Sequence, residues 1–254
     1  MGRWQRAKWR QLRTGLAYAY YGLGALVITL WLGLRRLVGA PMGRDDAQRL
    51  LRRGYDSFVR LMLALRLFRL RNIGLEALTG PGPRLIVANH PSMIDSALIV
   101  RHLPQADNFM SPSWARVPLI RSVGEAVAFI PSDGAQASVD AAVDCLRSGR
   151  TVVMFPEGTR SPTGGLGRFE RGAAHVALGS GCDLLPVLIR MDIPIEKKDE
   201  QWHEVPEGTP TIELRVMPPF SPSKVLDGSE PPMLAARKLT AALRGLYLKV
   251  LDLD

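Results

Sequence analysis

The sequence predicts an α/β fold: a largely parallel central sheet flanked by helices, with an N-terminal helical module seated in a membrane. Two observations predict it. Short apolar runs alternate with helical segments over residues 71–254, and a long uncharged run lies near the N-terminus. Strands that alternate with helices favour parallel pairing, because each connection crosses back over the sheet. We therefore divide the chain into membrane-anchoring helices (1–70) and an α/β domain (71–254).

The uncharged run covers residues 14–34 and has the sequence TGLAYAYYGLGALVITLWLGL. A helix of that length measures about 31 Å, close to the hydrocarbon thickness of a bilayer. Its aromatic side chains lie toward the two ends, where they favour the headgroup region. The run is longer than the apolar region of a signal peptide and is followed by Arg35 and Arg36, which argues against cleavage. We therefore expect insertion into a membrane.

The next segment, residues 46–70, places charged side chains on one helical face and apolar side chains on the other. This pattern is typical of a helix in the membrane interface, and almost equally of a helix docked on a soluble domain. Basic residues occur on both sides of the uncharged run, so they set no orientation. We prefer a two-helix module with both ends on the cytoplasmic side of the inner membrane. A single membrane span is the alternative.

The composition limits the classes of partner. With 33 Lys+Arg against 24 Asp+Glu, the formal net charge is +9, which calls for an anionic partner. The basic residues crowd around the apolar N-terminal segments without a nucleic-acid-binding motif, so we expect membrane lipids and no nucleic acid. Apolar residues make up 46% of the chain, which excludes a disordered protein. Two cysteines are too few for a disulfide scaffold or a Cys-rich zinc module.

Within the α/β domain, strands are predicted from short apolar runs and helices from the segments between them. The clearest strands are 84–89 and 151–155. Further strands are expected at 108–110, 128–130, 184–190 and 211–216. Helices are expected at 92–102, 114–127, 138–146, 171–178 and 233–251, and a surface loop at 193–209.

Unusual polar residues follow two of the predicted strands, and ligands of α/β sheets gather at the carboxyl ends of strands. The first strand end has the sequence NHPSMID, in which His90 leaves the strand and Asp95 falls in the first turn of the next helix. In that geometry the carboxylate reaches one imidazole nitrogen, fixes the tautomer and leaves the other nitrogen as a general base. Such a dyad suits the removal of a proton from an alcohol.

The second strand end has the sequence FPEGTRS, residues 155–161. Gly158 permits close approach of the backbone, and the amides that follow a strand can form an anion-binding concavity. Arg160 offers a forked donor for phosphate. Taken alone, this stretch is equally well a turn with a solvated arginine. Two polar strand ends in one sheet favour the functional interpretation.

Together these motifs resemble the glycerolipid (lysophospholipid) acyltransferase family, such as the 1-acyl-sn-glycerol-3-phosphate acyltransferases. Residues 89–95 match the family's N-H-x4-D block, and residues 155–161 match its F-P-E-G-T-R-S block. Phe169, Gly172 and Ala173 match a downstream F-x-x-G-A block, and residues 185–187 match a strand with a proline. The resemblance covers residues 84–190 and the membrane-seated N-terminus.

The resemblance implies direct transfer of a fatty acyl group from an acyl-carrier-protein (ACP) or coenzyme A (CoA) thioester to a hydroxyl. His90 is then the general base and Asp95 orients it. The resemblance also implies acceptor binding, typically of a glycerol phosphate headgroup, by Glu157, Gly158, Thr159 and Arg160. The chain has no G-x-S-x-G or H-E-x-x-H motif, so we expect no serine nucleophile, no metal and no cofactor beyond the thioester co-substrate.

The family's second block departs from its usual pattern in this chain. Ser111 stands where a lysine precedes Pro118 by seven residues, and residues 131–134 lack the closing arginine. This variant resembles acyltransferases associated with bacterial aryl-polyene and xanthomonadin pigments, and it leaves the acceptor open. Candidate replacements for the missing cation are Arg116, Arg121, Arg168 and Arg171.

Three functions remain after these observations. The first is a membrane-associated O-acyltransferase that acts on a lysophospholipid, most simply forming phosphatidic acid. The second is acyl transfer to an acceptor without glycerol phosphate, such as a pigment-type aryl polyene, because the arginine is missing. The third is a non-catalytic membrane module that kept the fold, and the intact His90 and Asp95 argue against it.

Overall fold

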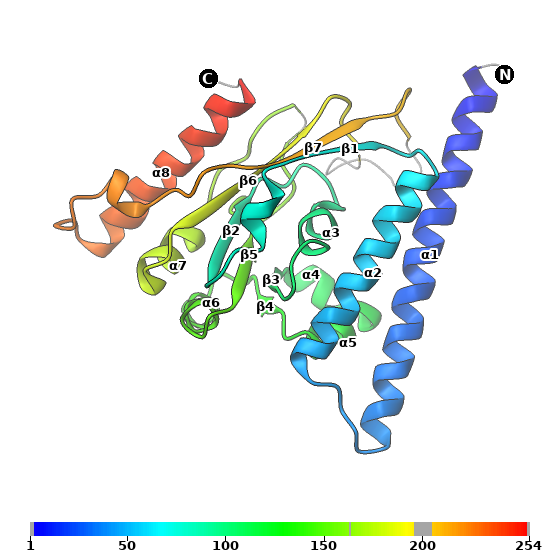
Figure 1. The fold of residues 1–254 in the computed structure, drawn as a ribbon, viewed down its shortest axis with the longest axis horizontal. Coiled ribbons are helices and arrows are strands. Elements are labelled where there is room, and N and C mark those ends of the chain that lie inside the picture. Colours follow the sequence, from blue (N-terminus) through cyan, green and yellow to red (C-terminus); the bar gives the residue numbers. More distant parts are fainter. Residues whose placement is uncertain (1–2, 163, 196–204, 253–254) are drawn as a thin grey trace.

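A computed structural model describes residues 3–162, 164–195 and 205–252, and shows one sheet with helices on both faces (Figure 1). The seven strands of these residues lie in the order β1-β7-β6-β2-β5-β3-β4. Neighbouring strands pair in parallel, except β6 and β7, which are antiparallel. The predicted α/β class with a largely parallel sheet is confirmed.

The elements have the following bounds. The strands are β1 (Arg69–Ile73), β2 (Arg84–Ala88), β3 (Asp107–Met110), β4 (Ile130–Pro131), β5 (Thr151–Met154), β6 (Leu184–Met191) and β7 (Thr211–Val216). The α-helices are α1 (Arg3–Leu37), α2 (Arg44–Ala64), α3 (Asp95–Val100), α4 (Pro112–Ala115), α5 (Pro118–Ala126), α6 (Gln136–Arg147), α7 (Gly172–Ser180) and α8 (Pro232–Leu251). Two short 3₁₀ helices cover Leu75–Leu78 and Pro222–Lys224.

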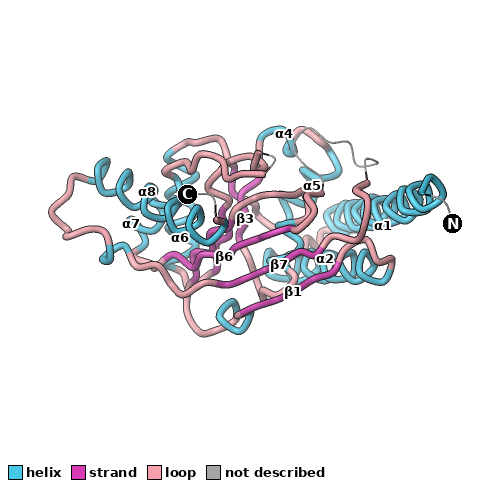
Figure 2. The backbone as a smooth tube through the Cα atoms, turned by 90° about the horizontal axis from the view of Figure 1, so that it is seen from above, coloured by secondary structure: helices cyan, strands magenta, loops and turns pink. Residues whose placement is uncertain are grey.

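The central strands are mostly apolar because helices cover both faces of the sheet. In β2, Leu85, Ile86 and Val87 are all fully buried. Ile86 joins a core that includes side chains of α2 and α3, whereas Leu85 and Val87 join a core with α6, α7 and α8. Figure 2 shows α2 and the group of α6, α7 and α8 toward opposite ends of the molecule, with the sheet between them.

The predicted helix 114–127 is two helices in the structure, α4 and α5. Val117 is extended between them, with φ −84° and ψ 112°. Pro118 then opens α5 at its first position, where the missing N–H leaves no hydrogen bond unmade. Because proline disfavours helical geometry in the residue before it, the break falls at Val117.

Helix α2 ends at Ala64, earlier than the predicted boundary at residue 70. Arg66 adopts the left-handed conformation, with φ 54°. The N–H of Leu67 donates to the carbonyl of Met62 at 3.0 Å, and the N–H of Arg66 donates to that of Leu63 at 2.9 Å. This is the Schellman arrangement that ends many helices, formed here without the usual glycine. The chain then enters β1, a strand that the sequence does not predict.

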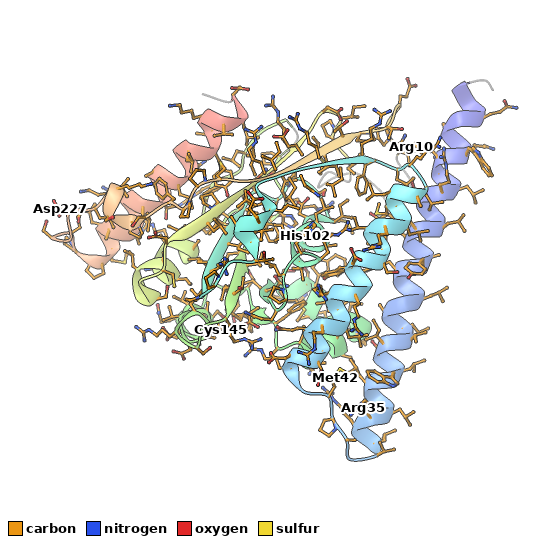
Figure 3. All side chains as sticks on the ribbon, viewed as in Figure 1. Arg10, Arg35, Met42, His102, Cys145 and Asp227 are labelled. Atoms are coloured by element: carbon orange, nitrogen blue, oxygen red, sulfur yellow. The ribbon has the colours of Figure 1, made fainter. Side chains whose placement is uncertain are left out.

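Helix α1 runs antiparallel to α2, and the two form a hairpin beside the sheet (Figure 1). Near the open end, Arg10 Nη2 donates to the carbonyl of Leu67 at 2.5 Å (Figure 3). Arg13 Nη1 donates to the carbonyl of Leu65 at 3.1 Å. These bonds satisfy carbonyl groups at the end of α2 and hold the two helices together.

One face of α1 is apolar and exposed along its length. Its exposed side chains include Trp9, Leu12, Leu16, Leu23, Val27, Leu30 and Leu34. The other face packs against α2 and α5, and Ala17 and Leu32 are buried there. By length and composition, Ala7–Leu37 is apolar enough to cross a membrane. Helix α1 therefore has one protein-facing side and one apolar side that no described residue covers.

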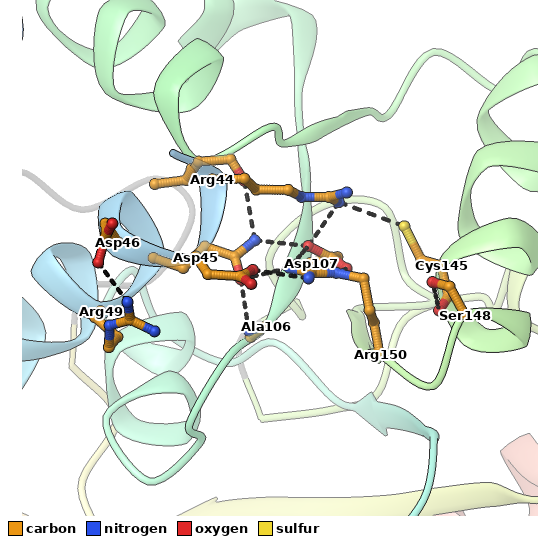
Figure 4. Close-up of polar contacts among 11 residues, drawn as sticks. Arg44, Asp45, Asp46, Arg49, Ala106, Asp107, Cys145, Ser148 and Arg150 are labelled. Atoms are coloured by element: carbon orange, nitrogen blue, oxygen red, sulfur yellow. Dashed lines mark hydrogen bonds and ion pairs between the residues drawn. The ribbon is translucent and has the colours of Figure 1, made fainter. Parts of the chain in front are cut away.

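Asp107 in β3 is fully buried and joins the hairpin to the sheet (Figure 4). Its carboxylate pairs with Arg44 Nη2 at 2.7 Å and with Arg150 Nε at 2.7 Å. Gln48 of α2 donates to the same carboxylate at 2.6 Å, and Arg150 also pairs with Asp45 at 2.8 Å. A buried carboxylate needs such partners, since an unpaired charge is costly inside a protein.

We expect Asp107→Asn to lower the free energy of unfolding by about 1–2 kcal/mol or more, because both ion pairs are lost and the amide NH2 group cannot accept a hydrogen bond from an arginine. Denaturant titration of the purified protein measures this change. Asp144→Asn is the matched control, since it removes an exposed carboxylate from α6. It should shift stability by less than about 0.5 kcal/mol. Equal stability of the two variants would contradict the joining role of Asp107.

Candidate active site

The two sequence motifs meet at the carboxyl ends of two neighbouring strands in the middle of the sheet. Strands β2 and β5 pair in parallel, so their carboxyl ends lie side by side. His90 follows β2, and residues 155–161 follow β5. The N–H of Ser161 donates to the carbonyl of His90 at 2.7 Å and ties the two loops directly. The register of the sheet thus brings both motifs into one site.

His90 and Asp95 form a hydrogen-bonded pair. Nδ1 of His90 lies 2.7 Å from Oδ2 of Asp95, which is fully buried, whereas 23% of the His90 side chain is exposed. Ser92 gives Asp95 two more hydrogen bonds, from its N–H at 2.7 Å and from its hydroxyl at 2.5 Å. Because a carboxylate only accepts, the ring proton lies on Nδ1 and Nε2 remains available as a proton acceptor.

The position of the His90 ring is set from several sides. Phe155 stacks against it, with ring centroids 4.3 Å apart and an interplanar angle of 26°. The preceding Asn89 is buried, and its side chain exchanges two hydrogen bonds of 2.8 Å with the backbone of Ile189 in β6. The strand end and the ring are therefore held before any substrate arrives, which is the condition for efficient proton transfer.

Glu157 is buried and has a different place from the one that the sequence suggests. Its Oε1 accepts from the N–H of His90 at 2.9 Å and from the hydroxyl of Ser161 at 2.7 Å. Its Oε2 accepts from the N–H of Gly167 at 2.6 Å. Protein donors thus engage both oxygens. The structure shows this carboxylate joining the His90 backbone to Ser161 and Gly167, and acceptor binding by Glu157 stays a prediction.

Two glycines are required by this geometry. A Cβ at Gly167 would lie 2.6 Å from Oε2 of Glu157, so any side chain there displaces the carboxylate. Gly158 has φ 65°, in the left-handed region that favours glycine. Its N–H donates to the carbonyl of Phe155 at 3.0 Å, which turns the chain sharply after β5.

The other predicted acceptor-binding residues lie on the surface of the same loop. Gly158 and Thr159 are exposed, and Arg160 is half-buried. Of the candidate cations, Arg116 and Arg168 are exposed, and Arg171 is half-buried at the start of α7. Arg121 pairs with Glu125 on its own helix, with Nε and Oε1 2.8 Å apart. Arg168 is the next residue after Gly167, whose N–H donates to Glu157, so its backbone lies beside that hydrogen bond.

Besides Asn89 and Phe155, four residues that hold the site are not among those predicted from the sequence. Ser92 and Ser161 lie inside the quoted motifs, where a hydroxyl near an acidic residue is a local signal for such a role. Gly167 and Arg244 give no such signal. Arg244 comes from α8, and its Nε donates to the carbonyl of Gly167 at 3.0 Å.

Among the residues that the structure describes, no group of three or more His, Cys, Asp or Glu side chains is placed to hold a metal ion. Independence from metals and other cofactors stays a prediction.

Comparison with known sequences shows what the region around the site is similar to. Residues 69–190 match the family described as Acyltransferase. The chain is 29% identical over 149 residues to the 1-acyl-sn-glycerol-3-phosphate acyltransferase LPAT1, chloroplastic, of Arabidopsis thaliana, covering 54% of this chain and 42% of that protein. It is 32% identical over 125 residues to the corresponding BAT2, chloroplastic, of Brassica napus, covering 46% and 36%. The matches thus span less than half the length of these curated relatives.

A shorter match and a solved structure complete the comparison. The 1-acyl-sn-glycerol-3-phosphate acyltransferase of Pseudomonas aeruginosa is 46% identical over 44 residues, 17% of each chain. The crystal structure of the 1-acyl-sn-glycerophosphate (LPA) acyltransferase PlsC from Thermotoga maritima has the same fold, with a TM-score of 0.68, 20% identity and 96% of both chains covered. The likeness therefore includes the N-terminal hairpin. Over residues 69–190, which hold both sequence motifs of the site, this chain is similar to the acyltransferase family.

Proposed function

We propose that this protein is an O-acyltransferase that moves a fatty acyl group from acyl-ACP or acyl-CoA to a hydroxyl of a lysophospholipid, such as 1-acyl-glycerol-3-phosphate. The observation that carries this proposal is the His90–Asp95 pair, 2.7 Å apart and partly exposed at the end of β2. The names of the curated relatives support the acceptor class. The acyl thioester is the co-substrate, and no other cofactor enters the proposal.

The chemistry follows from the dyad. Nε2 of His90 accepts the proton of the acceptor hydroxyl, and the hydroxyl oxygen forms a bond to the thioester carbonyl carbon. Asp95 stabilises the imidazolium that results. The carbon–sulfur bond then breaks, and the proton on His90 passes to the departing thiolate. The products are an ester and a free thiol, without an acyl-enzyme.

The shape of the N-terminal hairpin supports a seat in the membrane interface. The apolar face of α1 is exposed, while its other face packs against α2 and α5. Helix α2 packs against α1, so a bilayer-crossing α1 would bring the arginines of α2 into the hydrocarbon. Each arginine near the bilayer centre costs about 2.5–3.5 kcal/mol of insertion free energy. We therefore favour the two-helix module over the single span, with the catalytic domain on the cytoplasmic side of the inner membrane.

A substrate panel tests the function. The purified protein in neutral detergent receives acyl-ACP or acyl-CoA together with 1-acyl-glycerol-3-phosphate, other lysophospholipids or alcohols without phosphate, and mass spectrometry detects the ester. We expect turnover that requires a lysophospholipid acceptor. A folded preparation that acylates none of these acceptors would contradict the enzymatic proposal.

One observation favours a second candidate, an acceptor that lacks phosphate. The lysine position of the family's second block holds Ser111, whose hydroxyl hydrogen-bonds Ser113 at 2.8 Å. The nearby Arg121 pairs with Glu125, so it is not poised as a replacement. Turnover confined to acceptors without phosphate would decide for this candidate. The likeness to pigment-associated acyltransferases remains a prediction.

We expect Arg160→Ala to raise the acceptor KM by about tenfold or more and to change kcat less, because charge-assisted hydrogen bonds to the acceptor are lost in ground state and transition state alike. Steady-state kinetics with varied acceptor measure both constants. Arg237→Ala, which removes an exposed arginine from α8, is the matched control. An acceptor KM equal to that of the control would refute the binding role of Arg160.

A further inference from the structure

A cavity of about 680 Å³ lies between α2 and the end of α3, apart from the active site. Arg52, Arg53 and Arg60 of α2 line it, together with Arg101 and His102, which follow α3. Figure 3 labels His102, close to α3. Asp95 opens α3 and these two residues follow its end, so the cavity and the His90–Asp95 pair are about 9 Å apart along the helix axis.

The charge of this cavity is strongly positive. Four guanidinium groups line it, and Asp56 carries the only negative charge among the lining residues, so four positive charges less one leave a net charge of three. Asp56 is already engaged, with Arg101 Nη2 at 2.6 Å and with Arg60 Nε at 2.7 Å. Positive charges held so close repel one another, and an anion in the cavity would relieve the repulsion.

Several buried nitrogen atoms of the residues that line this cavity lack a hydrogen-bond partner in the described part of the chain. Nε of Arg52, Nε and Nη1 of Arg101 and Nε2 of His102 are shielded from solvent and make no hydrogen bond in the described part of the chain. Buried polar groups are almost always hydrogen-bonded, so these atoms indicate a ligand that supplies acceptors. Guanidinium groups match the oxygens of phosphate in geometry and charge.

His102 fits the same ligand. Burial lowers the pKa of its imidazole, and the charge of Arg101 lowers it further, against a smaller opposing effect of Asp56. The ring is therefore neutral near neutral pH, and its Nε2–H tautomer donates a hydrogen bond without adding charge. A bound phosphate dianion would in turn raise this pKa.

We infer that the cavity between α2 and α3 binds a phosphate group through Arg52, Arg101 and His102, at a site separate from the His90–Asp95 pair. The position of the cavity also relates it to the lipid-facing helix. Ser57 lines the cavity, and its hydroxyl hydrogen-bonds Tyr20, which lies along α1 next to the exposed apolar face. A lipid headgroup and a soluble phosphate offer the same chemistry here.

Titration of the full-length protein in neutral detergent tests the site. The two probes are inorganic phosphate and dihexanoyl phosphatidic acid, and isothermal titration calorimetry measures their Kd. Both probes are also titrated into Arg160→Ala, so that binding near the active site is recognised separately. We expect saturable binding of one equivalent that survives Arg160→Ala and is weakened about tenfold or more by Arg52→Gln or Arg101→Gln.

Arg49→Gln is the matched control, because it removes the same charge from the same helix outside the cavity, where Arg49 pairs with Asp46. Tighter binding of the lipid than of inorganic phosphate would identify a headgroup, and equal binding would identify the phosphate group alone. Absence of saturable binding of both probes would overturn the inference, and so would an equal loss in Arg49→Gln. If Arg101→Gln fails to fold, Arg52→Gln decides, since it leaves the Arg101–Asp56 pair intact.

Discussion

We expect His90→Ala to lower the rate of acyl transfer by about 10²- to 10⁴-fold, the usual effect of removing a general base. On the proposed mechanism the imidazole takes the proton from the acceptor hydroxyl, and the contacts with Asp95 and Phe155 hold the ring in position. Release of free thiol from the donor, followed at saturating donor and acceptor, measures the rate. Because the ring is partly exposed, its removal should leave the fold intact.

A second histidine supplies the control for this experiment. His175 lies half-buried in α7, outside the His90–Asp95 pair, and His175→Ala should keep the wild-type rate. Equal melting temperatures of the two variants would show that loss of activity is not loss of structure. Retention of more than a tenth of the wild-type rate by His90→Ala would end the general-base mechanism proposed above.

Glu157→Ala should destabilise the protein and inactivate it together. Three donors lose their acceptor, namely the N–H of His90, the hydroxyl of Ser161 and the N–H of Gly167. Each buried donor left without a partner costs about 1–3 kcal/mol, so we expect the free energy of unfolding to fall by about 3 kcal/mol or more. Denaturant titration measures this loss. Because one donor is the backbone of the base itself, kcat should fall as well.

Glu170→Ala is the matched control for Glu157→Ala, since it removes an exposed carboxylate from the same loop region. It should change neither stability nor kcat appreciably.

The two interpretations of Glu157 differ in their kinetics. A raised acceptor KM with normal stability and normal kcat would show that Glu157 binds the acceptor, as its place in the motif suggests, and would refute the positioning role.

Much of the fold is predictable from the sequence because its central strands are buried on both faces. The run at 84–89 has four consecutive apolar residues, 85–88, and lies between Pro83 and Pro91, which identifies β2. Strand β1 has no such signal. Its sequence RLRNI is polar and largely exposed at the edge of the sheet, and it becomes a strand by pairing with β7, Arg69 opposite Thr211. Partners so far apart in sequence leave no local pattern.

In the candidate site, too, contacts between neighbouring residues are predictable from the sequence and contacts between distant residues are not. His90 and Asp95 are five residues apart, so their pairing follows from a local turn and is predictable. The place of Glu157 depends on partners as far away as His90, 67 residues earlier in the chain. A conspicuous acid in a polar motif suggests ligand binding, and only the fold shows that its oxygens are engaged inside the protein.

On the proposed mechanism, the parts that remove the proton and the parts that select the alcohol have separate origins in the chain. His90, Ser92 and Asp95 belong to one uninterrupted stretch and find one another locally. The exposed tip at Gly158 and Thr159 belongs to another loop. On this proposal, changes confined to that exposed tip alter the products while the His90–Asp95 pair stays unchanged. Such a division makes the scaffold a favourable starting point for evolutionary diversification and for redesign.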